Sequence, residues 1–250
     1  MFNFKQKNVV MPKDSTVSVV IVAAGSGERL AAEAGAENGK ALLQVAGKPL
    51  IQHSLEIFAQ VDRVKDIIVV AREIDILAIY DIVNNEQIPK VRNIVPGGST
   101  RQHSVYNGLK EVSTDYVLIH DAARPCITLD DINDLITRLV ENGRPVTLAS
   151  KIIDTINRVQ NGTIVDTLDR DELFVVQTPQ GFNTTKLKHA HEKAIDDGFE
   201  STDDAGLLEN FGEKVHIVRG SSQNIKITYP DDVLVAEAIL AARENVYGVF

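Results

Sequence analysis

The sequence predicts an α/β fold in which a mostly parallel β-sheet is flanked by helices. Short runs rich in β-branched residues alternate with longer stretches of helical period, and this alternation is typical of parallel strands joined by crossover helices. Most of the short runs are continuously apolar, as expected for strands that are covered on both faces. The length of 250 residues and the 44% hydrophobic content fit one large domain over residues 1–250.

Seven short apolar runs are predicted to be strands. They span residues 18–23, 66–71, 91–95, 116–120, 146–150, 174–177 and 215–218. Helical periodicity predicts helices over residues 50–60, 73–84, 103–111, 129–141, 185–196, 203–210 and 231–243. Start signals support three of these helices, because Thr128 and Thr202 each precede two acidic residues and Pro230 occupies a first-turn position.

The segment 152–168 departs from this pattern. Apolar and polar residues alternate on either side of Asn161-Gly162, a dipeptide that strongly favours a hairpin turn. The sequence therefore predicts an antiparallel β-arm over residues 152–170 that protrudes from the sheet. An arm of this kind often pairs with a second copy of the chain, so we expect a homodimer.

Composition excludes several classes of protein. The net charge of −9 and the pI near 5.2 argue against a surface that binds nucleic acid or anionic lipid, although a few clustered cations could still bind a small anion. The single cysteine, Cys126, permits no intramolecular disulfide and no thiolate metal cluster, which fits a reducing compartment. No apolar run approaches the roughly 18 residues of a membrane span or forms a secretory segment, so we expect a soluble, cytoplasmic protein.

A glycine-rich loop follows the first predicted strand. Gly25 and Gly27 let a ligand approach the backbone closely, and successive amides can bind an anion. A strand followed by Gly-x-Gly is equally compatible with a phosphate loop and with a plain strand-to-helix turn. A dinucleotide fingerprint is disfavoured because Leu30 stands where a third small residue is required. Residues 35–40 are one residue short of a P-loop and are followed by Ala41 instead of Ser or Thr, so a P-loop is rejected.

Five short motifs occur in an order and spacing that is highly specific as a set. They are AAGSGER at 23–29, GGSTR at 97–101, HDAARP at 120–125, QTPQ at 177–180 and NIKIT at 224–228. With these motifs the chain resembles the 2-C-methyl-D-erythritol 4-phosphate cytidylyltransferases and, more distantly, the pentitol phosphate cytidylyltransferases. One difference lies at Gly39-Lys40, where that family usually has Pro-Lys. The lysine is kept, but the proline that would stiffen the loop is absent.

The resemblance implies a Rossmann-like fold of the nucleotidyltransferase type and an enzyme of the non-mevalonate isoprenoid pathway. CTP and a small polyol phosphate are the implied ligands, and Mg²⁺ or another divalent cation is the implied cofactor. A phosphate oxygen of 2-C-methyl-D-erythritol 4-phosphate would attack the α-phosphorus of CTP, and pyrophosphate would leave. The alternatives are transfer to ribitol 5-phosphate and a non-catalytic regulator that binds CTP.

Three cations and one carboxylate are implied to act on the phosphates. Lys40 and Lys226 would flank the α-phosphate, and Arg29 would hold the triphosphate. Taken singly, Arg29 and Lys226 would more often be solvated surface charges. Asp121 would bind Mg²⁺ or the ribose, because it follows an apolar strand at the edge where α/β sheets bind ligands. Its alternative role is a helix cap or a salt bridge with Arg124.

The resemblance also assigns residues to each of the two substrates. Nucleotide binding is assigned to Ala23, Ala24, Gly25, Gly27, Gly98, Ser99, Ser104 and Asp121. The alternative for Gly97-Gly98 is a simple turn between a strand and a helix. Binding of the second substrate is assigned to Arg124, Thr155, Arg170, Thr178 and Thr202. Because the arm crosses to the other subunit in this family, Thr155 and Arg170 would complete the partner's pocket; ordinary strand and cap usage is the alternative for the threonines.

Overall fold

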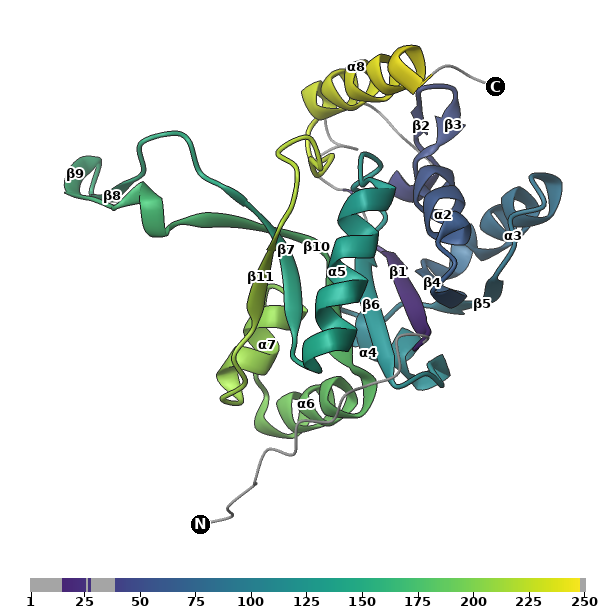
Figure 1. Cartoon of the computed structure of the whole chain (residues 1–250), viewed down its shortest axis with the longest axis horizontal. Coiled ribbons are helices and arrows are strands. Elements are labelled where there is room, and N and C mark those ends of the chain that lie inside the picture. The colour runs from purple at the N-terminus through teal and green to yellow at the C-terminus, as the bar shows by residue number, and fades with distance from the viewer. Residues whose placement is uncertain (1–14, 26, 28–38, 248–250) are drawn as a thin grey trace.

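A seven-stranded sheet forms the centre of the computed structural model, which describes residues 15–25, 27 and 39–247 (Figure 1). The strand order is β11-β7-β10-β6-β1-β4-β5. The strands are β1 (Val17–Ala23), β4 (Val64–Ala71), β5 (Val91–Pro96), β6 (Tyr116–Asp121), β7 (Val146–Lys151), β10 (Phe174–Asn183) and β11 (His216–Arg219). Neighbours pair in parallel except for β10, which is antiparallel to both β6 and β7. The predicted mostly parallel α/β fold is confirmed.

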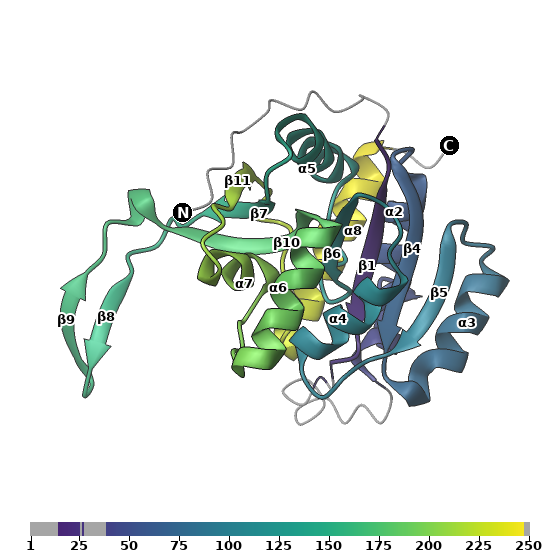
Figure 2. The ribbon, with the colours of Figure 1, turned by 90° about the horizontal axis from the view of Figure 1, so that it is seen from below.

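Helices cover both faces of this sheet (Figures 1 and 2). They are α2 (Leu50–Gln60), α3 (Ile76–Asn85), α4 (Arg101–Glu111), α5 (Leu129–Asn142), α6 (Thr184–Asp197), α7 (Asp204–Asn210) and α8 (Pro230–Tyr247). Short 3₁₀ turns occur at η1 (Lys40–Leu42), η2 (Glu73–Asp75) and η3 (Arg170–Glu172). A small hairpin that the sequence analysis did not predict joins β2 (Gln44–Val45) to β3 (Lys48–Pro49). Each predicted helix occurs, with ends that differ by a few residues.

The helix start signals are only partly confirmed. Thr128 caps α5 by accepting a hydrogen bond from the Asp131 amide at 3.1 Å, and α8 begins at Pro230. The capping role predicted for Thr202 is wrong. Asp203 caps α7 instead, because its carboxylate accepts from the Gly206 amide at 2.9 Å. A carboxylate is at least as good a cap as a hydroxyl, so sequence alone could not decide between these neighbours.

Strand β10 is longer than the predicted strand over 174–177. Pro179 argues against a continuing strand because it has no amide to donate. In the structure the pairing of β10 with β7 is irregular between Val176 and Gln180, so the proline lies at a break in the ladder. Strand β10 runs antiparallel to β7 because the arm between them returns the chain directly to the sheet.

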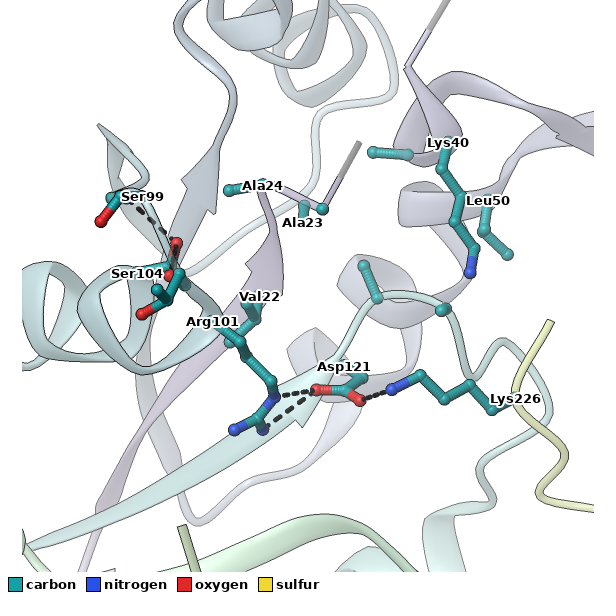
Figure 3. Close-up of a pocket in the computed structure, with 16 residues that line it drawn as sticks. Val22, Ala23, Ala24, Lys40, Leu50, Ser99, Arg101, Ser104, Asp121 and Lys226 are labelled. Carbon is teal, nitrogen blue, oxygen red and sulfur yellow. Dashed lines mark hydrogen bonds and ion pairs between the residues drawn. The ribbon is translucent and has the colours of Figure 1, made fainter. Parts of the chain in front are cut away.

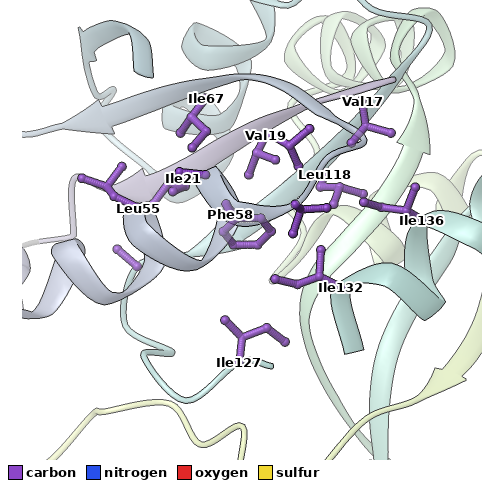
Figure 4. Close-up of a cluster of buried hydrophobic side chains, with 14 of the residues drawn as sticks. Val17, Val19, Ile21, Leu55, Phe58, Ile67, Leu118, Ile127, Ile132 and Ile136 are labelled. Carbon is purple, nitrogen blue, oxygen red and sulfur yellow. The ribbon is translucent and has the colours of Figure 1, made fainter. Parts of the chain in front are cut away.

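Two apolar clusters pack on opposite faces of the sheet. Along β1, Val19 and Ile21 point into the cluster beneath α2 and α5, which Figure 4 shows around Phe58. Val20 points to the other face, into the cluster formed with α4, α6 and α7. Successive strand side chains alternate between faces. A strand that is buried on both faces is therefore continuously apolar, as the sequence analysis assumed.

The predicted arm is present as the hairpin of β8 (Asn157–Gln160) and β9 (Thr163–Thr167). Asn161 and Gly162 both have positive φ, at 50° and 76°, as a tight hairpin turn requires. Every residue of both strands is exposed, and the hairpin extends away from the sheet (Figures 1 and 2).

No helix within residues 15–25, 27 and 39–247 has the length and apolar character needed to cross a lipid bilayer. The single-domain organisation and the cytoplasmic location remain predictions.

Candidate active site

Parallel register brings the predicted motifs to one edge of the sheet. Val22 of β1 lies opposite Asp121 of β6, and Ala23 of β1 lies opposite Ala71 of β4. The glycine-rich loop and the predicted acid therefore leave the sheet side by side. Carboxyl ends of parallel strands are where open α/β sheets bind their ligands.

A pocket of about 460 Å³ opens at this edge (Figure 3). It is lined by Val22, Ala23, Ala24, Gly25, Lys40, Ala41, Leu50, Gly98, Ser99, Thr100, Arg101, Ser104, Asp121, Ala122, Ala123 and Lys226. Nine of the residues assigned to catalysis or nucleotide binding are in this lining. Gly27 is not, but a Cβ placed there would lie 2.8 Å from the Cβ of Lys40, so the glycine loop contacts the lysine. Arg29 lies outside the described residues.

Asp121 is held between two cations. Its Oδ2 accepts from Lys226 Nζ at 2.7 Å, and its Oδ1 accepts from Arg101 Nε at 3.1 Å (Figure 3). Its amide donates to Thr178 Oγ1 at 3.0 Å. The alternative of a salt bridge to Arg124 is wrong, because the Arg124 guanidinium donates to the main-chain oxygen of Asn224 at 2.8 Å.

The surroundings keep the Asp121 carboxylate ionised. Burial acts to raise its pKa, but the charges of Arg101 and Lys226 outweigh burial and hold the pKa of Asp121 well below its ordinary value. The neighbouring His120 is different. Burial lowers the pKa of His120 to about 3, so its ring is neutral near pH 7. The positive charge at the floor of the pocket therefore comes from the arginine and the lysine.

Arg101 is the residue that the sequence analysis missed. Its NH1 also donates to Asp204 Oδ2 at 2.8 Å, and Asp204 Oδ1 lies 3.1 Å from His191 Nε2. Asp204 and His191 are both buried. A buried chain of charged and polar groups therefore extends from the pocket to α6. Arg101 belongs to the GGSTR motif, so the signal existed, but its acidic partners are 20 and 103 positions away in sequence.

The glycines before α4 have a packing role. A Cβ on Gly97 would overlap the Ala24 side chain, and a Cβ on Gly98 would overlap His103. The Gly98 amide also donates to Ser104 Oγ at 3.0 Å. The close approach of Gly97 to Ala24 brings the turn before α4 next to the end of β1. The pair is thus a strand-to-helix turn, and Gly98 also lines the pocket.

A second pocket of about 220 Å³ adjoins the first. It is lined by Arg101, Asp121, Arg124, Val176, Gln177, Thr178, Gln180, Thr202, Asp203 and Lys226. Three of the residues assigned to the second substrate, Arg124, Thr178 and Thr202, meet here. The other two do not: Thr155 and Arg170 are exposed on the arm, where Arg170 NH1 donates to the Ile153 carbonyl at 2.8 Å.

Cys126 does not contribute a reactive group. Its side chain is fully buried, and burial raises the pKa of its thiol to about 11. A thiol of this kind stays protonated near neutral pH and is a poor nucleophile. Cys126 instead packs as a small apolar side chain in the cluster with Val45, Leu50 and Ile227.

Small residues that expose main-chain groups, and cations gathered around one ionised carboxylate, form a pocket at the carboxyl edge of an open α/β sheet. Fold and site together define a nucleotide-binding protein of the α/β class. The chain belongs to the 2-C-methyl-D-erythritol 4-phosphate cytidylyltransferase (IspD) family, whose model matches residues 17–242.

Individual relatives agree with this assignment. A 2-C-methyl-D-erythritol 4-phosphate cytidylyltransferase of Halalkalibacterium halodurans is 43% identical over 229 residues, which cover 91% of this chain and 98% of the relative. One of Clostridium botulinum (strain 657 / Type Ba4) is 42% identical over 228 residues, covering 89% and 96%. The crystal structure of 4-diphosphocytidyl-2C-methyl-D-erythritol synthase from Anaerococcus prevotii superposes with a TM-score of 0.79 at 32% identity, covering 92% of this chain and 100% of that one.

Proposed function

We propose that this protein transfers a cytidylyl group from CTP to 2-C-methyl-D-erythritol 4-phosphate and releases pyrophosphate. The observation that supports it best is the boundary between the two pockets. Arg101, Asp121 and Lys226 line both, so a nucleotide in the larger pocket and a small phosphate in the smaller one would meet at these three side chains. The names of the relatives give the same acceptor and the same transferred group.

The chemistry requires little beyond alignment and neutralisation of charge. A phosphate oxygen of the acceptor forms a bond to the α-phosphorus, and the bond from that phosphorus to the pyrophosphate oxygen breaks. Both reactants are anions that repel each other. Positive charge at the place where the two reactants meet comes from Lys226, Lys40 and Arg101. Preorganised charge of this kind stabilises the transition state without a covalent enzyme intermediate.

Asp121 would hold Mg²⁺ in this scheme. Among the residues that the structure describes, it is the one carboxylate that lines the larger pocket, and these residues contain no cluster of three or more His, Cys, Asp or Glu side chains suited to a metal. That donor set fits Mg²⁺, which commonly takes one or two carboxylates and completes its shell with substrate phosphates and water. When bound, the ion would neutralise phosphate charge. Lys226 and Arg101 would then donate some of their hydrogen bonds to the phosphates instead of to the Asp121 carboxylate.

The function is tested by pyrophosphate release from CTP. We expect turnover with 2-C-methyl-D-erythritol 4-phosphate and Mg²⁺, and loss of turnover when EDTA removes the ion, because the side-chain cations alone would have to neutralise both the triphosphate and the Asp121 carboxylate. Ribitol 5-phosphate is the matched control substrate. Turnover on ribitol 5-phosphate alone would reverse the choice of acceptor. Tight CTP binding without pyrophosphate release on either substrate would indicate a regulator.

We also infer that the arm joins two copies of the chain. Val159 and Ile164 pair across the hairpin and are 53% and 59% exposed, an unusual amount of apolar surface for two strands without a sheet to cover them. A second copy would bury these side chains and bring Thr155 and Arg170 of one arm toward the partner's pocket.

Sedimentation velocity tests the dimer. We expect the wild type to sediment as a dimer and a V159D/I164D variant as a monomer with reduced turnover, because buried carboxylates would oppose the interface. Leu234→Asp, at a 67% exposed apolar residue on α8, is the matched control and should leave the dimer intact. A monomeric wild type with full turnover would refute the inference.

A further inference from the structure

An ion pair packs against the residue that precedes Lys40. Arg72 follows the end of β4 and Asp75 ends η2. Arg72 Nε donates to Asp75 Oδ2 at 2.6 Å, and Arg72 NH2 donates to Asp75 Oδ1 at 2.8 Å. Two parallel hydrogen bonds of this kind fix the planes of both groups. The Asp75 side chain is only 5% exposed, so the pair is shielded from water on the acid's side.

Gly39 lies directly under this pair. It is buried, and a Cβ placed there would overlap both Arg72 NH2 and Asp75 Oδ2. Its φ of −56° and ψ of 150° are values that any residue adopts, and the φ lies in the narrow range that proline fixes. Glycine is therefore not needed here for its backbone freedom. It is needed because the ion pair occupies the space beside it.

The contact matters because it adjoins a pocket lysine. The Gly39 carbonyl accepts from the Leu42 amide at 2.9 Å, which closes the 3₁₀ turn that begins at Lys40. On its other side, the Lys40 Cβ contacts Gly27 of the glycine-rich loop. Glycine loses more conformational freedom on folding than any other residue, so a stretch with Gly39 before Lys40 needs an external support to stay in one place.

We propose that the Arg72–Asp75 pair, which we call the clamp, positions Lys40. The clamp fills the space beside Gly39 and holds the 39–42 turn, so that the Lys40 ammonium faces the triphosphate. The inference rests on the proposed function for the role of Lys40, and on packing for the clamp itself. Neither member of the pair lines the pocket, so both act through Gly39. A group misplaced by about 1 Å can lower the rate on the order of 10²-fold, so a displaced 39–42 turn would reduce catalysis by Lys40.

The first test is Asp75→Asn, which keeps the shape of the side chain and removes its charge. We expect kcat to fall about tenfold while KM for CTP changes little, because Lys40 acts mainly on the transition state. Hydrogen exchange of the Leu42 amide should become faster, since that amide reports the turn directly. Glu213→Gln, which removes one charge of the Lys186–Glu213 pair, is the matched control and should change neither, because neither residue lines the pocket.

The second test replaces the Arg72–Asp75 clamp with the ring of a proline at position 39. Gly39→Pro alone should clash with the ion pair and lower kcat, whereas Gly39→Pro combined with Arg72→Ala and Asp75→Ala should restore most of the activity that Arg72→Ala and Asp75→Ala lose together. A rescue of this kind distinguishes positioning from direct phosphate binding by Arg72, which a proline could not replace.

The outcomes are separable from those of the proposed function. An inactive wild type would overturn the function, yet the exchange rate of the Leu42 amide would still test the clamp. Unchanged exchange and unchanged kcat in Asp75→Asn, or no rescue by Gly39→Pro, would overturn the clamp even if the wild type turns over normally.

Discussion

Replacement of Lys226 by alanine is expected to lower kcat by about 10² to 10³ while the fold stays intact. Lys226 Nζ lies 2.7 Å from Asp121 at the boundary of both pockets, where it can move from the carboxylate to a phosphate, since its side chain is 41% exposed. The backbone should hold without it, because the buried Ile227 next to it donates its amide to the Ala123 carbonyl at 2.9 Å.

Steady-state kinetics and circular dichroism check this result together. Lys186→Ala is the matched control, since Lys186 forms an ion pair of 2.6 Å with Glu213 and is exposed on α6, remote from either pocket. It should leave kcat nearly unchanged, as expected for an exposed pair. A Lys226→Ala protein that turns over like the wild type would remove this residue from the catalytic machinery.

Arg101→Met is expected to have the largest effect on stability, a loss of about 3–5 kcal/mol in the free energy of unfolding. The guanidinium joins two buried acids, Asp121 and Asp204. Burial acts to raise the pKa of Asp204, but Arg101 and His191 hold that pKa below its ordinary value. Methionine keeps the apolar stem but leaves Asp204 with only the histidine to compensate its charge.

Urea unfolding at pH 7 measures this loss. The double variant R101M/D204N provides the control, because it removes the uncompensated carboxylate as well and should recover part of the lost free energy. The coupling between the two sites then appears as a departure from additivity. An Arg101→Met protein as stable as the wild type, or a double variant less stable than the two single changes predict, would show that this ion pair does not stabilise the fold.

The site was only partly predictable. The short motifs indicated most of the pocket lining, because the residues after one strand stay together in sequence and in space. Arg101 stands inside one of those motifs and was still assigned no role. Its meaning depends on Asp204, which α7 brings to it from 103 positions away. The prediction of Thr202 as a cap failed for the opposite reason, since a neighbouring carboxylate competed for the same amide.

The sequence by itself determined the succession of strands and helices along the chain, the hairpin at Asn161-Gly162 and the family. These follow from periodicity, turn chemistry and contiguous motifs, which are local properties of the chain. Only the tertiary structure decided which charges meet: Arg101 with two acids, and Arg72 with Asp75 against Gly39. Such contacts depend on strand order and register, and those are set by the burial of the whole sheet between its helices rather than by any single segment.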